Sequence, residues 1–178
     1  EVRYSNTERS DAWMKATNLG LKDTLLVATV NSNTAWLGTW AKRIEFKIDN
    51  TKIDSELTNF PVAVALGTSV GKDNQDNTVV FDELGAGNSL KVAFTTADGT
   101  TECYAECELY DEVNEKALYH VKIPTVSADV DTVFYMYFDS TQSDNSTYIG
   151  ALASTTAQNV WDANYTAVYH LANNPASS

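Results

Sequence analysis

Apolar and polar residues alternate with a period of two through the middle of the chain, from about residue 40 to residue 140. In the first such stretch, Ile44, Phe46 and Ile48 alternate with charged side chains. Strict alternation is typical of a β-strand with one buried and one solvated face. The pattern gives three further inward-facing sets: Leu90, Val92 and Phe94; Cys103, Ala105, Cys107 and Leu109; and Ala117, Tyr119, Val121 and Ile123.

Two runs, residues 62–66 and 132–138, are apolar on both faces and predict central strands. Asp98-Gly99 predicts a hairpin turn between two of the alternating strands. A succession of short strands separated by turns predicts an all-β fold, an antiparallel β-sandwich of jelly-roll-like form with short helical turns. The residues expected in or near its core are Val62, Val64, Phe94, Val121, Val133 and Tyr135.

The two ends of the chain have other patterns. The N-terminal segment, residues 1–39, is expected to contain a short strand at 2–4 and an apolar, β-branched strand at 25–30. Between them, Ser10 has the side chain of a helix N-cap, so one or two helical turns should follow it. Trp40, directly after this segment, is expected to anchor the junction in the core.

The C-terminal segment, residues 141–178, is richer in polar residues. It is expected to contain a polar loop, a helical turn near 156–161 and a strand at 167–171. The chain therefore divides into segments 1–39, 40–140 and 141–178.

The charge balance limits the partners of the protein. Twelve Lys and Arg residues against 24 Asp and Glu give a net charge of −12. A protein that binds nucleic acid carries a basic surface, so we expect no nucleic-acid partner. Strong acidity suits a protein that stays soluble outside cells, or one that is exposed to salt or divalent cations. No apolar run approaches the ~18 residues of a membrane helix, so we expect no membrane insertion.

Several short motifs occur together between Trp40 and Leu171. They are Leu57-Thr58-Asn59-Phe60-Pro61-Val62, Asp98-Gly99-Thr100-Thr101-Glu102, Val121-Lys122-Ile123-Pro124, Asp131-Thr132-Val133-Phe134-Tyr135-Met136-Tyr137, Val160-Trp161-Asp162 and Tyr169-His170-Leu171. In this order and spacing they resemble an uncharacterised β-domain family, a domain of unknown function common in bacterial, archaeal and phage surface proteins. The family has no established activity, so the resemblance implies a location and neighbouring modules rather than a reaction.

The resemblance also bears on the two ends. In such proteins the last of these motifs leads into a laminin G-like (concanavalin A-like) jelly roll, and residues 1–13 resemble the closing strand and turn of one. It therefore implies that 1–39 closes one such domain and that 141–178 opens another, so both ends would belong to domains whose remainder lies elsewhere. The family usually has Trp near Tyr110 and again near His120, and a sugar platform built on those tryptophans would be altered here.

No catalytic set is recognisable among the cysteines and histidines. Cys103 and Cys107 are four residues apart on one strand, roughly 13 Å, which exceeds the ~7 Å limit between the Cα atoms of a disulfide. We expect them not to pair. His120 falls on the outward phase of its strand and is expected at the surface or at an interface, and His170 is expected to pack or hydrogen-bond locally. We therefore predict no catalytic residue, no cofactor and no enzymatic activity.

Acidic residues give two weaker patterns. Glu102, Glu106 and Glu108 alternate along one strand, which favours a solvated face over the paired carboxylates of a glycosidase. Two polar loops supply oxygen ligands for calcium without following an EF-hand. No metal is assigned on this basis, and the weak calcium candidates are Asp73, Asp76, Asp139 and Asp144.

Exposed aromatic residues can stack on sugar rings, and the ligand candidates are Tyr104, Tyr110 and Trp36. We interpret the chain as a non-enzymatic structural or adhesive module of an extracellular fibre or filament, on a cell or virion surface. Its partners would be copies of itself or neighbouring modules packed head-to-tail. The alternative is a carbohydrate-binding module of a surface, phage receptor-binding or polysaccharide-active protein, with glycans as partners.

Overall fold

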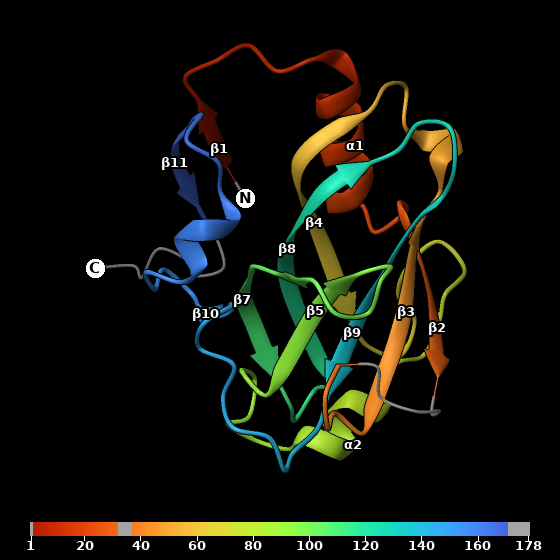
Figure 1. Cartoon of the computed structure of the whole chain (residues 1–178), viewed down its shortest axis with the longest axis vertical. Coiled ribbons are helices and arrows are strands. Elements are labelled where there is room, and N and C mark those ends of the chain that lie inside the picture. The colour runs from red at the N-terminus through yellow and green to blue at the C-terminus, as the bar shows by residue number, and fades with distance from the viewer. Residues whose placement is uncertain (1, 32–36, 171–178) are drawn as a thin grey trace.

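The computed structural model describes residues 2–31 and 37–170 of the chain (Figure 1). Strands dominate the described part, which confirms the all-β, sandwich-like fold. In chain order, the strands are β1 (Val2–Ser5), β2 (Leu26–Asn31), β3 (Lys42–Ile48), β4 (Leu57–Leu66), β5 (Val92–Thr96), β6 (Glu102–Cys103), β7 (Ala105–Asp111), β8 (Lys116–Val126), β9 (Thr132–Phe138), β10 (Ile149–Ala151) and β11 (Tyr165–Tyr169). The helices are α1 (Asp11–Leu21) and α2 (Val79–Leu84), with 3-10 turns η1 (Asn50–Lys52) and η2 (Ala157–Val160).

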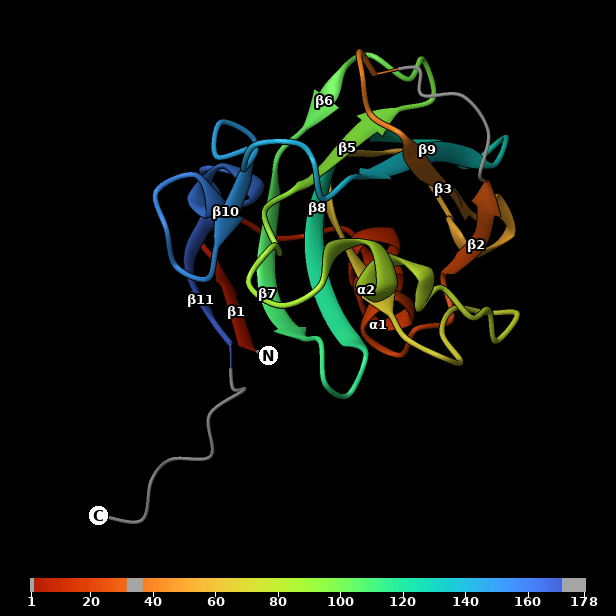
Figure 2. The same cartoon turned by 90° about the horizontal axis from the view of Figure 1, so that it is seen from below.

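Two sheets form the sandwich, and a separate pair of strands lies beside it (Figures 1 and 2). One sheet has the order β10-β7-β8-β4 and the other β2-β3-β9-β5-β6, while β1 pairs only with β11 among the described strands. Every pair is antiparallel except β10 with β7, which differs from the purely antiparallel prediction. Parallel neighbours need a long crossover, and here the chain passes through β8 and β9 before it returns beside β7.

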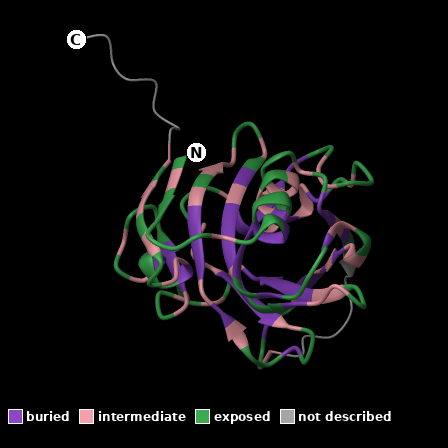
Figure 3. Ribbon diagram, turned by 90° about the horizontal axis from the view of Figure 1, so that it is seen from above, coloured by how far each residue is buried: buried purple, intermediate pink, exposed green. Residues whose placement is uncertain are grey.

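The hydrophobic core lies between the two sheets (Figure 3). Phe46 and Phe134 stack with ring centroids 5.3 Å apart, and the ring of Phe94 contacts Tyr119 across the sandwich at 5.6 Å. The expected core residues Val62, Val64, Phe94 and Val121 are fully buried, as predicted. Residues 62–66 lie in β4, which is the edge strand of its sheet, so the prediction of a central strand there is wrong.

A second, smaller cluster covers the other face of the five-stranded sheet. Trp40, Ala93, Tyr135 and Tyr137 are buried there, with Val133 packed against them. Strand β9 therefore buries both faces, as its continuous apolar run predicts. Trp40 is 9 % exposed and anchors the start of β3, as expected.

Helix α1 is longer than the one or two turns predicted after Ser10. The Ser10 hydroxyl accepts a hydrogen bond from the Trp13 amide at 3.2 Å, which confirms the N-cap. The indole of Trp13 packs edge-on against Phe60 of β4 at 5.0 Å. Apolar contacts thus extend the helix beyond the cap signal, and they join it to the same core cluster as the sandwich strands.

A β-bulge in β7 changes the phase predicted for the end of this strand. Cys107 pairs with Tyr119 and Leu109 pairs with Leu118, which leaves Glu108 as the extra residue. Leu109, expected to face inward, is 44 % exposed. Tyr110, expected to face outward, instead packs on Phe81 of α2. Strict alternation cannot predict such an inserted residue.

Candidate functional site

The candidate site lies on the outer face of β7 and β8, beneath β11 and the segment after η2 (Figures 1 and 2). Glu106 and His120 are directly paired across these strands, with exposed fractions of 2 % and 0 %. The prediction that this glutamate face is solvated is therefore wrong, and His120, which was expected at the surface or at an interface, is buried within the fold. The period-two pattern assigns these side chains to the outer face correctly, but the chain folds back and covers that face.

Gly150 explains how the covering segment comes so close. Strand β10 adds to the edge of β7, and η2 then packs directly on β10. A Cβ atom at Gly150 would lie 2.2 Å from the Ala157 amide nitrogen, so no larger residue fits without a shift. This contact sets η2 against the sheet, and Trp161, the residue after η2, then reaches Glu106.

Glu106 is the most buried carboxylate of the site, and three groups donate hydrogen bonds to it. The Ala153 amide donates to Oε1 at 3.1 Å, and Trp161 Nε1 donates to Oε2 at 3.0 Å. His170 Nε2 contacts the same Oε2 at 3.1 Å. Burial acts to raise the pKa of Glu106, but these donors outweigh it and the pKa is lowered. Glu106 is therefore a buried anion.

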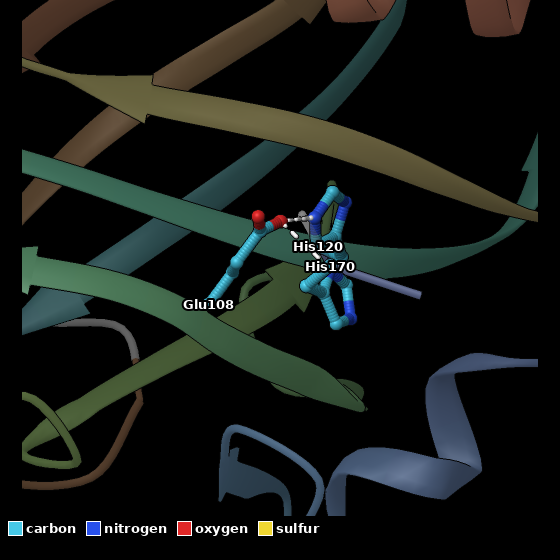
Figure 4. Close-up of side chains that lie close together, drawn as sticks. All are labelled: Glu108, His120 and His170. Carbon is cyan, nitrogen blue, oxygen red and sulfur yellow. Dashed lines mark hydrogen bonds and ion pairs between the residues drawn. The ribbon is translucent and has the colours of Figure 1, made fainter. Parts of the chain in front are cut away.

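Glu108, His120 and His170 converge beside it from β7, β8 and the residue after β11 (Figure 4). Glu108 Oε2 lies 2.5 Å from His120 Nε2 and 3.0 Å from His170 Nδ1. The second contact is an ion pair that lacks the angle of a hydrogen bond. One nitrogen or oxygen from each of the three side chains lies within 4.8 Å of the other two, and no other such group of three His, Cys, Asp or Glu residues occurs in the described ranges.

The charges of this cluster follow from its contacts. Burial acts to lower the pKa of His170, but the contacts with Glu106 and Glu108 on its two nitrogens raise it to about 9. Burial likewise acts to raise the pKa of Glu108, and the two histidines hold it well below its usual range. At neutral pH His170 is a cation between two carboxylates.

Two arginines attach the β1–β11 pair to the sandwich. Arg3 Nη2 lies 3.3 Å from His120 Nδ1, and its guanidinium carbon is 4.6 Å from the centre of the Trp161 ring. Arg9 donates two hydrogen bonds to the Asp162 carboxylate, at 3.0 and 2.7 Å. These contacts place β1 and β11 firmly over the outer face of β7 and β8.

A pocket of about 430 Å³ opens beside the cluster. Glu106 and His170 form part of its wall, so the buried charges are reached from this side. Trp161 and Tyr165 add aromatic surface, and their rings meet edge to face at 5.4 Å. The remaining lining residues include Gln158 and Asp162, so the pocket combines aromatic rings with hydrogen-bonding groups.

The aromatic ligand candidates do not meet in this pocket. Tyr104 is half-buried, with its ring 5.3 Å from that of Tyr148. Tyr110 donates a hydrogen bond from its hydroxyl to the Gly85 carbonyl at 3.0 Å, and burial raises its pKa to about 12. Its prediction as an outward-facing residue is wrong because of the bulge in β7. Trp36 lies outside the described residues.

Among the described residues, no calcium candidate belongs to a group of three metal-ligating side chains. Asp76 accepts hydrogen bonds from the amide and hydroxyl of Thr78, and Asp73 lies 3.9 Å from Lys72. Asp139 accepts hydrogen bonds from the Ala41 and Thr141 amides, so it joins its own loop to the residue that precedes β3. Asp144 is exposed and lines a shallow surface pocket with Trp40 and Glu102.

Both cysteines are free and buried. Burial is the main reason that the pKa is raised, to about 12 for Cys103 and to about 11 for Cys107. Low thiolate content and lack of access make them poor nucleophiles and poor metal ligands.

Sequence reasoning missed the cluster because its members are far apart in sequence. Glu106 and Glu108 lie one hairpin before His120. Trp161 and His170 lie in a segment more than forty residues after His120. The one available signal was that Trp161-Asp162 and His170 belong to the motifs that resemble the surface-protein β-domain family. That signal pointed to a family and not to a site.

Comparisons with protein-family profiles, with curated proteins and with solved structures found no match to this chain. The resemblance to the surface-protein β-domain family therefore stays a prediction. Neither α-helix in the described part of the chain has the length and apolar character needed to cross a membrane.

Proposed function

We propose that the protein is a non-enzymatic structural or adhesive module of an extracellular surface assembly, and that it associates with copies of itself or with neighbouring modules. The observation that carries this proposal is the β1–β11 pair. Neither strand pairs with any other strand in the described ranges, so each offers an open edge. Open edges are templates for the addition of another strand.

One face of this pair is also apolar and exposed. Val2 pairs directly with Tyr169, and Tyr4 lies two residues from Val2, so the three side chains share a face. They are 38 %, 56 % and 57 % exposed, respectively, and the two tyrosine rings meet edge to face at 6.1 Å. Arg3, between Val2 and Tyr4, is directed to the other face and contacts His120. The pair thus presents a rigidly held hydrophobic face with two open edges, which suits packing against a further module.

Sedimentation velocity over a concentration series tests this proposal. The double substitution Tyr4→Lys and Tyr169→Lys places two charges on the proposed contact face and should abolish concentration-dependent association. Val113→Lys with Val130→Lys is the matched control, because these valines are 86 % and 64 % exposed on other loops. A wild-type chain that stays monomeric at every concentration, or equal association of both double variants, would contradict the proposal.

Point substitutions are preferable to removal of residues 1–30. Trp13, Leu25 and Leu26 in that segment belong to the hydrophobic core, so their loss would disturb the sandwich as well as the contact face. Circular dichroism of each variant confirms that the fold is retained before association is compared.

The second candidate function is carbohydrate binding, and the pocket beside Glu106 favours it. Trp161 and Tyr165 offer ring surface, while Gln158 and Asp162 offer hydrogen-bonding groups for hydroxyls, a combination typical of small-molecule sites. Tyr165→Ala should then weaken the binding of the protein to any glycan that it recognises on an array. Tyr148→Ala, which removes a tyrosine outside this pocket, should leave that binding unchanged. Equal binding by both variants would exclude this pocket as the glycan site.

A further inference from the structure

We infer that Glu108, His120 and His170 form a binding site for a divalent transition-metal ion, and that Zn²⁺ suits it best. The inference is independent of the proposed function. It rests on the convergence of three ligand side chains and on the groups that surround them.

The three ligand atoms are close to the arrangement that Zn²⁺ requires. Ligand atoms at the usual 2.0–2.1 Å from a tetrahedral zinc ion lie about 3.3 Å apart. Here the Glu108 oxygen lies 2.5 Å from His120 Nε2 and 3.0 Å from His170 Nδ1, as expected for hydrogen-bonded and ion-paired groups. An outward adjustment of about 1 Å or less at the carboxylate would fit the ion. Glu108 can make this adjustment because it is the extra residue of the bulge and is not paired with a residue of β8.

The ligand types decide which metals fit. Two imidazole nitrogens and one carboxylate oxygen form a borderline donor set, which favours Zn²⁺, Ni²⁺ or Cu²⁺ over the hard cations Ca²⁺ and Mg²⁺. The cluster therefore differs in chemistry from the aspartate-rich loops considered for calcium. Its side chains are 0 %, 10 % and 9 % exposed, for His120, Glu108 and His170, so binding would occur away from bulk water.

The groups around the ligands resemble the outer shell of a zinc site. A ligating histidine usually donates a hydrogen bond from its other ring N–H to a carboxylate. His170 Nε2 contacts Glu106 in this way at 3.1 Å. Glu106 is itself fixed by Trp161 Nε1 and the Ala153 amide. The pocket wall contains Glu106 and His170, so the pocket reaches one of the three ligands and its carboxylate partner.

Metal binding at His120 would change the hydrogen bond between Arg3 and this histidine. Arginine only donates hydrogen bonds, so the 3.3 Å contact makes His120 Nδ1 the acceptor and leaves the ring proton on Nε2, facing Glu108. A metal on Nε2 requires the other tautomer, with the proton on Nδ1, and the Arg3 guanidinium must then withdraw. We therefore assign Arg3 as the cation that the metal displaces.

Each proton is accounted for in this exchange. Without metal, Glu108 contacts one nitrogen of each histidine, and Arg3 contacts Nδ1 of His120. When the ion binds, His170 Nδ1 releases one proton to solvent, His120 moves its proton from Nε2 to Nδ1 through solvent, and Arg3 withdraws.

The test measures metal binding by the full chain without a histidine tag. Isothermal titration with ZnCl₂ should give one ion per chain, and Co²⁺ should give the visible absorption bands of a nitrogen- and oxygen-ligated ion. Glu108→Gln and His120→Gln should each weaken Zn²⁺ binding about tenfold or more, because each removes one of three ligands. Glu102→Gln, which removes a carboxylate outside the cluster, should leave the affinity unchanged.

Arg3→Gln is the sharpest variant, because its amide oxygen can accept a hydrogen bond from His120 Nδ1–H. It should raise the affinity for Zn²⁺, whereas Lys122→Gln, which removes a positive charge from the same strand as His120, should not. Equal affinities in these two variants would overturn the role assigned to Arg3. Absence of both a Zn²⁺ isotherm and Co²⁺ bands in the folded wild-type chain, or unchanged affinity in Glu108→Gln and His120→Gln, would overturn the site itself.

Discussion

Replacing Asp162 by Asn tests how firmly the covering segment is attached to the rest of the fold. Asp162 accepts two hydrogen bonds from Arg9, at 3.0 and 2.7 Å, and the guanidinium lies between the rings of Trp13 and Tyr165, at 4.3 and 4.7 Å. Asn has nearly the same shape and keeps an oxygen for the Asn164 amide, which donates to Asp162 at 2.9 Å. The substitution therefore removes mainly the charge and one acceptor of the two-pronged pair.

The burial of the pair sets the expected magnitude. An exposed ion pair contributes about 0–1 kcal/mol, and removal of one partner from a fully buried pair costs about 3–5 kcal/mol. The side chains of Arg9 and Asp162 are 12 % and 17 % exposed, between these limits. We expect the free energy of unfolding to fall by about 2 kcal/mol, which for a domain of this size lowers Tm by about 4–8 °C.

A matched control separates burial from distance. Lys15 and Asp54 approach to 2.6 Å, as closely as Arg9 and Asp162, but their side chains are 45 % and 55 % exposed. Asp54→Asn should therefore change the free energy of unfolding by less than about 0.5 kcal/mol. Urea unfolding at pH 7 measures both variants, and equal losses in the two would refute the argument from burial.

The pH dependence follows from the same pair. Burial acts to raise the pKa of Asp162, but the hydrogen bonds from Arg9 and Asn164 outweigh it and the pKa is lowered. A lowered carboxyl pKa gives stability that is fully present above the unfolded value of about 3.9 and is lost as the pH falls through the folded value. The difference in stability between wild type and Asp162→Asn should stay constant from about pH 5 to pH 8 and shrink below about pH 4. A difference that persists unchanged at pH 2 would contradict the ionic origin.

Three further predictions concern backbone space and thiol access. Gly150→Ala should lower the free energy of unfolding by about 3 kcal/mol or more in urea titrations, because the added Cβ would lie 2.2 Å from the Ala157 nitrogen. Gly20→Ala, in the last turn of α1, should instead raise it by about 0.5–1 kcal/mol, because the nearest atom is 3.8 Å away and alanine favours the helix. Cys103 and Cys107, both buried with raised pKa, should react with a disulfide reagent at pH 8 only after denaturation; rapid labelling of the native chain would argue against the burial of these residues.

The sandwich strands could be predicted because each strand directs every second side chain into the core between the two sheets. Val62, Val64 and Val121 follow this rule, and the doubly apolar β9 is buried on both sides. Periodicity reports only the local environment of a strand, so it could not predict that β10 runs parallel to β7. That arrangement depends on a crossover between the sheets, which leaves no local pattern.

The candidate site was beyond sequence reasoning for a related reason. Alternation placed Glu106 and His120 on an outer face, and such a face is usually solvated. Only the fold brings Trp161 and His170 over it and converts exposed charges into a buried network. The extra residue at Glu108 is equally invisible, because a bulge depends on how two strands align and not on the composition of either strand.

The pairing of Val2 with Tyr169 has a mechanical consequence. In this antiparallel pair the first residue of one strand lies beside the last residue of the other. Tension applied between Val2 and Tyr169 would pull across the strands and open their hydrogen bonds one at a time, starting at that end. The sandwich strands would carry little of this load until β1 and β11 had separated and Arg3 and His170 had left Glu106, Glu108 and His120. Under stretch, the β1–β11 pair would therefore lengthen the molecule before the hydrophobic core experiences any force.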